Sequence, residues 1–181
     1  MCACVLGAIA LAGCGSHARS AAPAASTVTA AFKGSPPALA ALHAQANRLL
    51  DGGEPAFRAL LLRLRGYAVV VNKWASWCGP CKSEFPAFQQ AAVRFGRRVA
   101  FVGLNGRGDT RTEAAAFLRT FPVTYPSYVD RDESIARTLN AAQYYPLTVY
   151  LDRSGKPVYE HAGAYVSAGA LEQDIRRYLL R

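Results

Sequence analysis

Apolar side chains along this chain change their spacing from one segment to the next, and the spacing predicts where helices and strands lie. They recur every three or four residues over 39–50 and 55–65, which predicts two helices. Unbroken runs of β-branched and aromatic residues at 67–74, 99–104 and 147–151 predict strands that are buried on both faces. These five segments already indicate a mixed α and β domain.

The segments between and after these runs complete the pattern. They are a helix after Cys81, a helix capped by Thr110 or Thr112, an edge strand at 125–129, a helix at 133–139, an antiparallel strand at 157–161 and a helix capped by Ser167. Such alternation places helices on both faces of a largely parallel sheet, and the last hairpin adds antiparallel strands. We therefore expect an α/β fold with a central mixed β-sheet flanked by helices and an N-terminal helical extension.

Residues 1–14 have the pattern of an export signal. The apolar run 5–12 is shorter than the ~20 residues that cross a bilayer as a helix, and it fits a secretory leader. The residues Leu11-Ala12-Gly13-Cys14 resemble a bacterial lipobox, although no Lys or Arg precedes them. The resemblance implies that Cys14 receives a lipid and becomes the first residue; an ordinary or uncleaved leader is the alternative.

The next segment, 15–37, is rich in Ala, Ser, Thr and Pro and poor in large apolar side chains. It buries too little surface to offset the entropy of ordering, so we predict a flexible tether between the lipid and a domain at 38–181. This organisation places the domain outside the cytoplasmic membrane, in a periplasm or on an outer face, where disulfides persist.

Composition and charge narrow the classes of partner. Hydrophobic residues make up 51% of the chain, enough for one core, and the formal net charge is +9. The positive charge is scattered arginine, without the runs of about five or six like charges found in nucleic-acid-binding arms. We therefore expect a solvated basic surface, a monomer and no nucleic-acid partner; a preference for acidic partners or anionic headgroups is the alternative.

The candidate chemistry lies in the run Trp77-Cys78-Gly79-Pro80-Cys81. Cys78 follows a predicted strand and opens a predicted helix, where free backbone N–H groups and the helix dipole stabilise a thiolate. Because the thiolate attacks disulfides, we predict that Cys78 is the exposed nucleophile and that Cys81, one turn later, resolves the mixed disulfide. Gly79 would allow a partner backbone to approach, Pro80 would stiffen the first turn, and Trp77 would shield the thiolate.

Two structural roles for these cysteines are weaker alternatives. A purely structural disulfide between Cys78 and Cys81 would close a loop too short to remove much chain entropy. A zinc site needs four clustered ligands, and the three histidines are scattered along the sequence. We expect no metal and no cofactor other than the redox-active pair itself.

The stretch from Val69 to Pro86 resembles the extracytoplasmic thioredoxins of the TlpA and ResA type, and the resemblance extends over 55–181. It implies a thioredoxin fold and thiol–disulfide exchange. Cytoplasmic thioredoxins place a buried Asp where this chain has Asn72, which cannot titrate. The TlpA and ResA type instead has a Glu three residues after the second cysteine, here Glu84. The resemblance implies that Glu84 takes the proton of the second cysteine; a solvated helix residue is the alternative.

The same resemblance implies that Pro146 is a cis-proline whose loop faces the cysteines. It also implies that the backbone just before Pro146 pairs with a substrate strand. A trans proline at the start of a strand is the alternative. Tyr145 would then touch the incoming partner, and Tyr144 would widen an apolar rim that suits a protein substrate. Lys73 and Lys82 flank the site and could stabilise the thiolate, although such lysines are more often solvated.

These expectations converge on a membrane-anchored thiol–disulfide oxidoreductase. It would pass electrons from a membrane thiol donor to disulfides of exported proteins, and the family resemblance suggests cytochrome c maturation as one use. A disulfide oxidase or isomerase on the same fold is one alternative. A non-enzymatic metallochaperone or holdase is another. A peroxidase would need a Pro-x-x-x-Thr-x-x-Cys run, which the sequence does not contain.

Overall fold

The computed structural model describes residues 23–181, so the predicted leader, the lipid acceptor Cys14 and the first part of the predicted tether lie outside the described residues. The helices are α1 (Ala25–Phe32), α2 (Pro37–His43), α3 (Gly53–Arg63), α4 (Gly79–Phe95), α5 (Arg111–Thr120), α6 (Ser134–Thr138) and α7 (Ala168–Leu179). The strands are β1 (Leu49–Leu50), β2 (Ala68–Trp74), β3 (Val99–Asn105), β4 (Ser127–Val129), β5 (Leu147–Leu151) and β6 (Pro157–Ala162).

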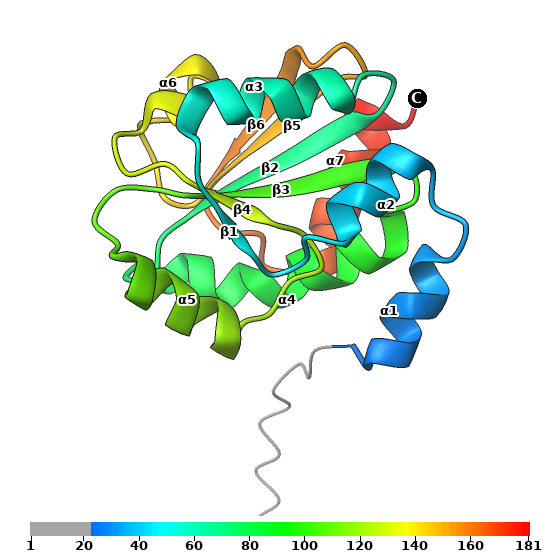
Figure 1. Cartoon of the computed structure of the whole chain (residues 1–181), viewed down its shortest axis with the longest axis horizontal. Coiled ribbons are helices and arrows are strands. Elements are labelled where there is room, and N and C mark those ends of the chain that lie inside the picture. Colours follow the sequence, from blue (N-terminus) through cyan, green and yellow to red (C-terminus); the bar gives the residue numbers. More distant parts are fainter. Residues whose placement is uncertain (1–22) are drawn as a thin grey trace, which may run out of the picture.

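The strands form one mixed sheet in the order β1-β4-β3-β2-β5-β6 (Figure 1). The first four strands in this order are parallel, while β5 is antiparallel to both β2 and β6. β2 and β3 are buried along their whole length, as their continuous apolar sequences predict. The C-terminal ends of the parallel strands therefore share one edge of the sheet, where the chain after β2 reaches α4.

Helices cover both faces of the sheet, as predicted (Figure 1). One face carries α4, α5 and α7, whose core side chains include Phe85, Phe88, Phe117, Leu171 and Ile175. The other face carries α2, α3 and α6, whose core side chains include Leu39, Leu42, Phe57, Leu60 and Ile135. Trp74 is fully buried in the first cluster. The expected α/β arrangement with a central mixed sheet is thus confirmed.

Two of the predicted helix caps are also present. Thr110 accepts a hydrogen bond from the Glu113 N–H, and the Glu113 carboxylate accepts one back from the Thr110 N–H, which completes a capping box at the start of α5. Ser167 accepts a hydrogen bond from the Ala170 N–H at 3.2 Å and begins α7. No helix within residues 23–181 combines the length and the apolar character needed to cross a bilayer.

The prediction of a flexible tether through residue 37 is wrong for its second half, because residues 25–32 form α1. Phe32 at the end of α1 stacks on the ring of His43 with centroids 3.8 Å apart. This contact attaches α1 to α2, and it depends on an aromatic partner that composition alone does not reveal.

The prediction of one helix over 39–50 is also wrong. α2 ends at His43, and Asn47 has a left-handed backbone with φ 60°. Asn47 donates from Nδ2 to the Leu118 carbonyl and accepts from the Val123 N–H, so it is tied to a distant segment. Leu49 and Leu50 then form β1 beside β4. β4 is therefore an inner strand rather than the predicted edge strand, because the two-residue β1 covers its free side.

Candidate active site

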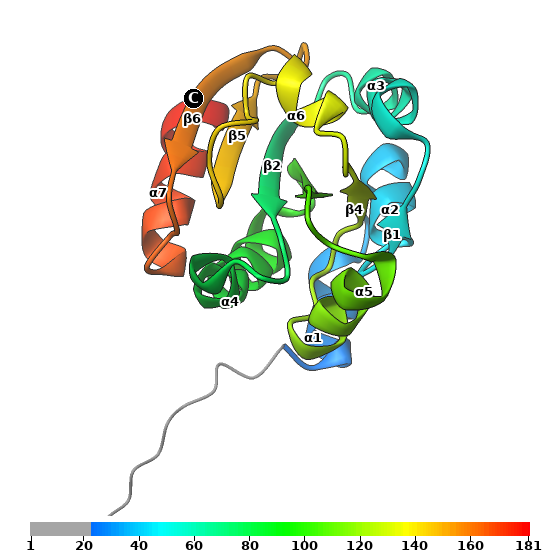
Figure 2. The ribbon, with the colours of Figure 1, turned by 90° about the vertical axis from the view of Figure 1, so that its left-hand side faces the viewer.

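The chain leaves β2 and enters α4 at one edge of the sheet (Figure 2). The two cysteines lie at this junction. Cys78 is the N-cap residue of α4, and its Sγ accepts a hydrogen bond from the Cys81 N–H at 3.1 Å. The two sulfurs are joined in a disulfide, with Cα atoms 5.3 Å apart. The predicted position at a helix start is thus confirmed, and the N–H group that contacts the sulfur would also stabilise a thiolate after reduction.

The exposure predicted for Cys78 is wrong for this oxidised chain. Cys78 is 3% exposed and Cys81 is fully buried, because both belong to the apolar cluster under α4. Next to them, Gly79 and Pro80 are exposed, and a Cβ atom at Gly79 would meet no atom within 4 Å. A partner can therefore approach across Gly79. Cys78 retains a small solvent-exposed fraction, whereas Cys81 has none.

Glu84 lies one helical turn after Cys81 and is fully buried, so the solvated alternative is wrong. Its Oε1 accepts a hydrogen bond from Asn72 Nδ2 at 2.7 Å, and its Oε2 accepts one from the Tyr165 N–H at 3.1 Å. Burial raises the pKa of Glu84 to about 7, although both hydrogen bonds act in the opposite direction. A carboxyl group with this pKa can both accept and release a proton near neutral pH.

Replacing Glu84 with glutamine should remove a pH dependence of folding stability. The pKa of Glu84 rises on folding from its ordinary value of 4.5 to about 7. The folded chain therefore binds this proton more tightly than the unfolded chain. The resulting stability is fully present below about pH 4.5 and is lost as the pH rises through about 7. The loss corresponds to about 3 kcal/mol.

Urea unfolding of the oxidised chain at pH 4.5 and pH 8 measures this effect. The free energy of unfolding should fall between the two pH values in the wild type and in a Glu160→Gln control, whose side chain lies on the exposed surface of β6. It should fall by about 3 kcal/mol less in Glu84→Gln. Equal declines in all three chains would contradict the buried, titrating Glu84.

The peptide bond between Tyr145 and Pro146 is cis, as the family resemblance implies. Pro146 is buried and leads into β5, which pairs with β2 directly before the cysteine loop. The Tyr145 ring lies against the Trp77 ring with centroids 5.0 Å apart. Trp77 and Tyr144 are both more than half exposed. The structure thus brings Trp77 and Tyr145 together into an apolar rim, and the binding roles of these residues stay predictions.

Asp109 is a site residue that sequence reasoning missed. It is buried in the loop after β3, where its Oδ2 accepts hydrogen bonds from the Ser76 N–H at 2.8 Å and from Asn105 Nδ2 at 2.6 Å. Its Oδ1 accepts another from Ser76 Oγ at 2.6 Å. These bonds fix the turn that leads into Cys78. An Asp in the Gly-rich loop at the end of a predicted inner strand was the available signal.

Lys73 is the clearest error among the flanking residues. Its side chain is buried rather than solvated, and its Nζ lies 2.8 Å from Glu133 Oε1, a partner that no local sequence pattern indicates. It projects from β2 next to Asn72, and successive strand residues point to opposite faces, so it cannot share the face on which Asn72 meets Glu84. Lys82 is exposed, as the more common reading of such lysines predicts.

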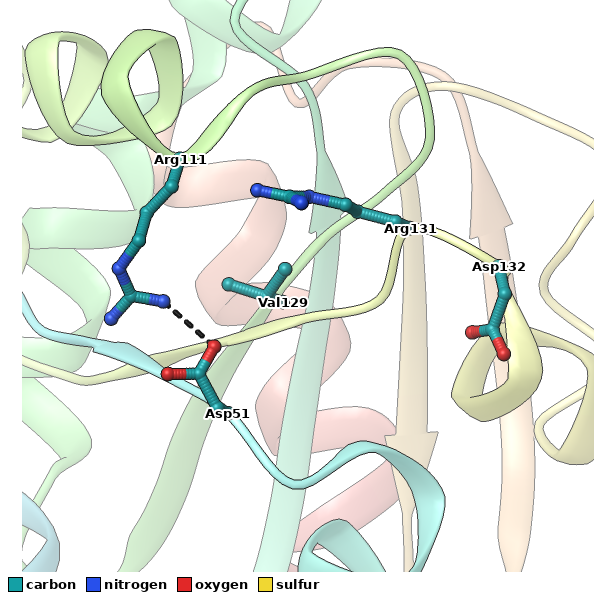
Figure 3. A pocket seen from close by; sticks show the side chains of 5 residues that line it. All are labelled: Asp51, Arg111, Val129, Arg131 and Asp132. Atoms are coloured by element: carbon teal, nitrogen blue, oxygen red, sulfur yellow. Dashed lines mark hydrogen bonds and ion pairs between the residues drawn. The ribbon is translucent and has the colours of Figure 1, made fainter.

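A second surface feature lies on the same edge of the sheet, beyond the end of β4. It is an open cavity of ≈ 470 Å³, lined by Asp51, Arg111, Val129, Arg131 and Asp132. Arg111 reaches Asp51 at 2.7 Å, while the Arg131 side chain points across the cavity toward the Arg111 side (Figure 3). The residues that line the cavity carry both charge signs and include neither cysteine.

Comparison with known proteins gives consistent matches. A family model described as "AhpC/TSA family" matches residues 50–159. The thioredoxin-like protein YneN of Bacillus subtilis (strain 168) is 32% identical over 93 residues, which are 50% of this chain and 54% of that protein. The thiol-disulfide oxidoreductase ResA of the same strain is 29% identical over 102 residues, 56% of each chain. The chain thus spans little more than half the length of these curated relatives.

Among solved structures, a DsbF homologue from Corynebacterium diphtheriae is similar with a TM-score of 0.60 and 29% sequence identity. The similarity covers 65% of this chain and 75% of that one. Together with the mixed sheet and its flanking helices, it confirms the expected thioredoxin-like fold.

Proposed function

This chain belongs to the AhpC/TSA family, and on that premise we propose that it reduces disulfides of exported proteins through Cys78 and Cys81. The observation that carries the proposal is the disulfide at the start of α4, where the Cys78 sulfur receives a backbone N–H. The buried Glu84 one turn later supports it, because proton transfer is the other requirement of exchange. The relatives whose names describe thiol–disulfide chemistry support it as well.

The proposed reaction begins with the reduced chain. The Cys78 thiolate attacks one sulfur of a substrate disulfide, and the other substrate sulfur leaves as a thiolate. Cys81 then loses its proton to Glu84 and attacks the Cys78 sulfur, which releases the second substrate thiolate. Two electrons have passed to the substrate, and the chain carries the Cys78–Cys81 disulfide seen in the structure. No cofactor enters this scheme.

The substrate would lie across the surface formed by Gly79, Pro80 and the contacting rings of Trp77 and Tyr145. Gly79 has open space beside it, Pro80 is exposed, and Trp77 with Tyr145 forms the apolar rim. Pro146 leads into the strand next to β2. An extended segment of polypeptide fits such a surface better than a small thiol does, because the rim offers apolar contact to side chains that flank the reacting disulfide.

The proposal also includes the cellular setting. We place the domain outside the cytoplasmic membrane, attached through a lipid on Cys14 and acting as a monomer. A membrane thiol donor would return the chain to its reduced form. Reduction of haem-binding cysteines during cytochrome c maturation is one use of such a reductant. Incorporation of labelled fatty acid into the wild type, and its loss in Cys14→Ser, tests the anchor.

A redox titration separates reduction from the alternative of disulfide oxidation. The Gly79-Pro80 dipeptide resembles that of reducing thioredoxins, so we expect the Cys78–Cys81 couple to lie near the potential of thioredoxin, about −270 mV, rather than near that of a strong oxidant, about −120 mV. Equilibration with dithiothreitol buffers measures it. A midpoint close to the oxidant value would favour the oxidase, and full biological activity of Cys78→Ser would favour a non-enzymatic holdase or metallochaperone.

A further inference from the structure

A buried ion pair next to the apolar rim has no part in the exchange chemistry. Lys73 Nζ lies 2.8 Å from Glu133 Oε1, and the two side chains are 1% and 8% exposed. Nζ also donates hydrogen bonds to the carbonyl oxygens of Ala141 and Ala142, each at 2.9 Å. All three protons of the ammonium group therefore have acceptors.

This pair holds Tyr145 from two directions. Lys73 Nζ lies 3.9 Å from the centroid of the Tyr145 ring, in the geometry of a cation–π contact. The Tyr145 hydroxyl donates to Glu133 Oε1 at 2.5 Å, so one carboxylate oxygen accepts from both side chains. Burial acts to raise the pKa of Glu133, but the hydrogen bonds from Lys73 and Tyr145, together with the positive charges of Lys73 and Arg107, keep that pKa below its ordinary value. Burial lowers the pKa of Lys73, and the hydrogen bond and charge of Glu133 act against that shift.

The contacts continue from Tyr145 to Trp77 through the backbone of one residue. The Arg107 N–H donates to the Tyr145 hydroxyl at 3.0 Å, and the Arg107 carbonyl accepts from Trp77 Nε1 at 3.2 Å. Two glycines permit this approach. A Cβ atom at Gly106 would lie 1.9 Å from the Tyr145 hydroxyl oxygen, and one at Gly108 would lie 2.8 Å from Trp77 Nε1.

A buried ion pair is weak evidence for a role in stability, because replacing such a pair with well-packed apolar residues often leaves the folding stability unchanged or increases it. This pair instead fixes the orientation of the Tyr145 ring. Glu133 has φ 56°, a backbone conformation that is uncommon for its residue type, and its carboxylate contacts the residue just before Pro146. The structure therefore fixes a substrate-facing ring with charged groups that are themselves out of reach of substrate.

We propose that Lys73 and Glu133 are positioning residues for substrate docking. They hold Tyr145, and through Arg107 also Trp77, as a fixed apolar wall for an extended polypeptide segment with an apolar side chain beside its disulfide. This inference rests on the proposed function, because it concerns the same site. Preorganised contacts lower the entropic cost of binding a flexible segment, so their loss should weaken docking rather than the sulfur chemistry.

The test compares two disulfides of different size. The reduced chain is mixed with oxidised glutathione, and separately with a peptide of about 20 residues that carries one internal disulfide flanked by leucine and tyrosine, while the oxidation of Cys78 and Cys81 is followed in time. In Glu133→Gln, the half-saturating peptide concentration should rise about tenfold, and the limiting rate should change less than about twofold. The rate with oxidised glutathione should also stay within about twofold of the wild type.

Two further variants keep the test decisive. Glu54→Gln removes one partner of the exposed Glu54–Arg58 ion pair and should leave both disulfides unaffected. If Glu133→Gln does not fold, the double variant Lys73→Met with Glu133→Gln replaces both charges by neutral groups of similar size. It should show the same selective loss of peptide docking.

An unchanged half-saturating peptide concentration in a folded variant would overturn the positioning role. Equal losses with peptide and with glutathione would overturn it too, because a general loss of reactivity indicates damage to the cysteine pair. A wild-type chain that reduces neither disulfide would overturn the proposed exchange itself, an outcome distinct from both variant results.

Discussion

A chain in which Cys81 is replaced by serine should stop at a covalent complex with its substrate. Cys78 keeps its place at the start of α4, so the first attack on a substrate disulfide still occurs. The sulfur that would release the product is missing, because a serine hydroxyl cannot displace a thiolate from a disulfide. Steady-state reduction should fall by at least about a thousandfold, while a mixed disulfide through Cys78 accumulates.

Non-reducing electrophoresis followed by mass spectrometry of the cross-linked peptide measures this outcome in cells. Cys78→Ser is the matched variant and should lose reduction to the same extent without accumulating a complex. A double variant that lacks both cysteines reveals any partner captured by Cys2, Cys4 or Cys14. Trapping through Cys81 in the Cys78→Ser chain, or no covalent partner at all in Cys81→Ser, would contradict the assigned order of attack.

Glu84→Gln should slow the second step of exchange by about 10- to 100-fold near pH 7.5, because the buried carboxylate no longer removes the Cys81 proton. Since the pKa of Glu84 is about 7, the wild-type rate should rise as the pH increases through that value. In the variant the rise should move toward the ordinary thiol pKa of about 8.5. Glutamine keeps the shape of the side chain and can still accept the hydrogen bond from the Tyr165 N–H.

Rapid-quench measurement of mixed-disulfide decay between pH 5.5 and 9.5 gives this profile. Glu160→Gln is the control, because it removes a carboxylate from the exposed surface of β6. Its profile should match that of the wild type. The same profile in Glu84→Gln as in the wild type would remove Glu84 from proton transfer and leave it a purely structural role.

The parts of the fold that the sequence predicts are those whose signals are local. β2 and β3 are continuous apolar runs, and Thr110 and Ser167 are followed by the helices that they cap. β1 was missed because two residues are too few to show any periodicity, and helical spacing from Leu39 onward concealed it. The helix ends before Asn47, because Asn47 forms hydrogen bonds with Leu118 and Val123. These partners lie far along the chain, so no local pattern reveals them.

The candidate site divides in the same way. The cysteine pair was found from its own motif, and Glu84 and Pro146 from a family resemblance at fixed spacing. Lys73 and Glu133 are 60 residues apart in the sequence, and no local pattern in either segment indicates their contact. A lysine inside a run of buried strand residues was nevertheless a usable signal, since an ammonium group at such a position requires a partner.

The reactivity of the reduced chain toward iodoacetamide, measured from pH 5 to 10, tests most directly whether Cys78 is a thiolate stabilised at a helix start. We expect Cys78 to be alkylated first, with a rate that is half-maximal at a pH clearly below the ordinary thiol value of about 8.5. Alkylation of Cys81 first, or a half-maximal pH at or above about 8.5, would contradict that assignment.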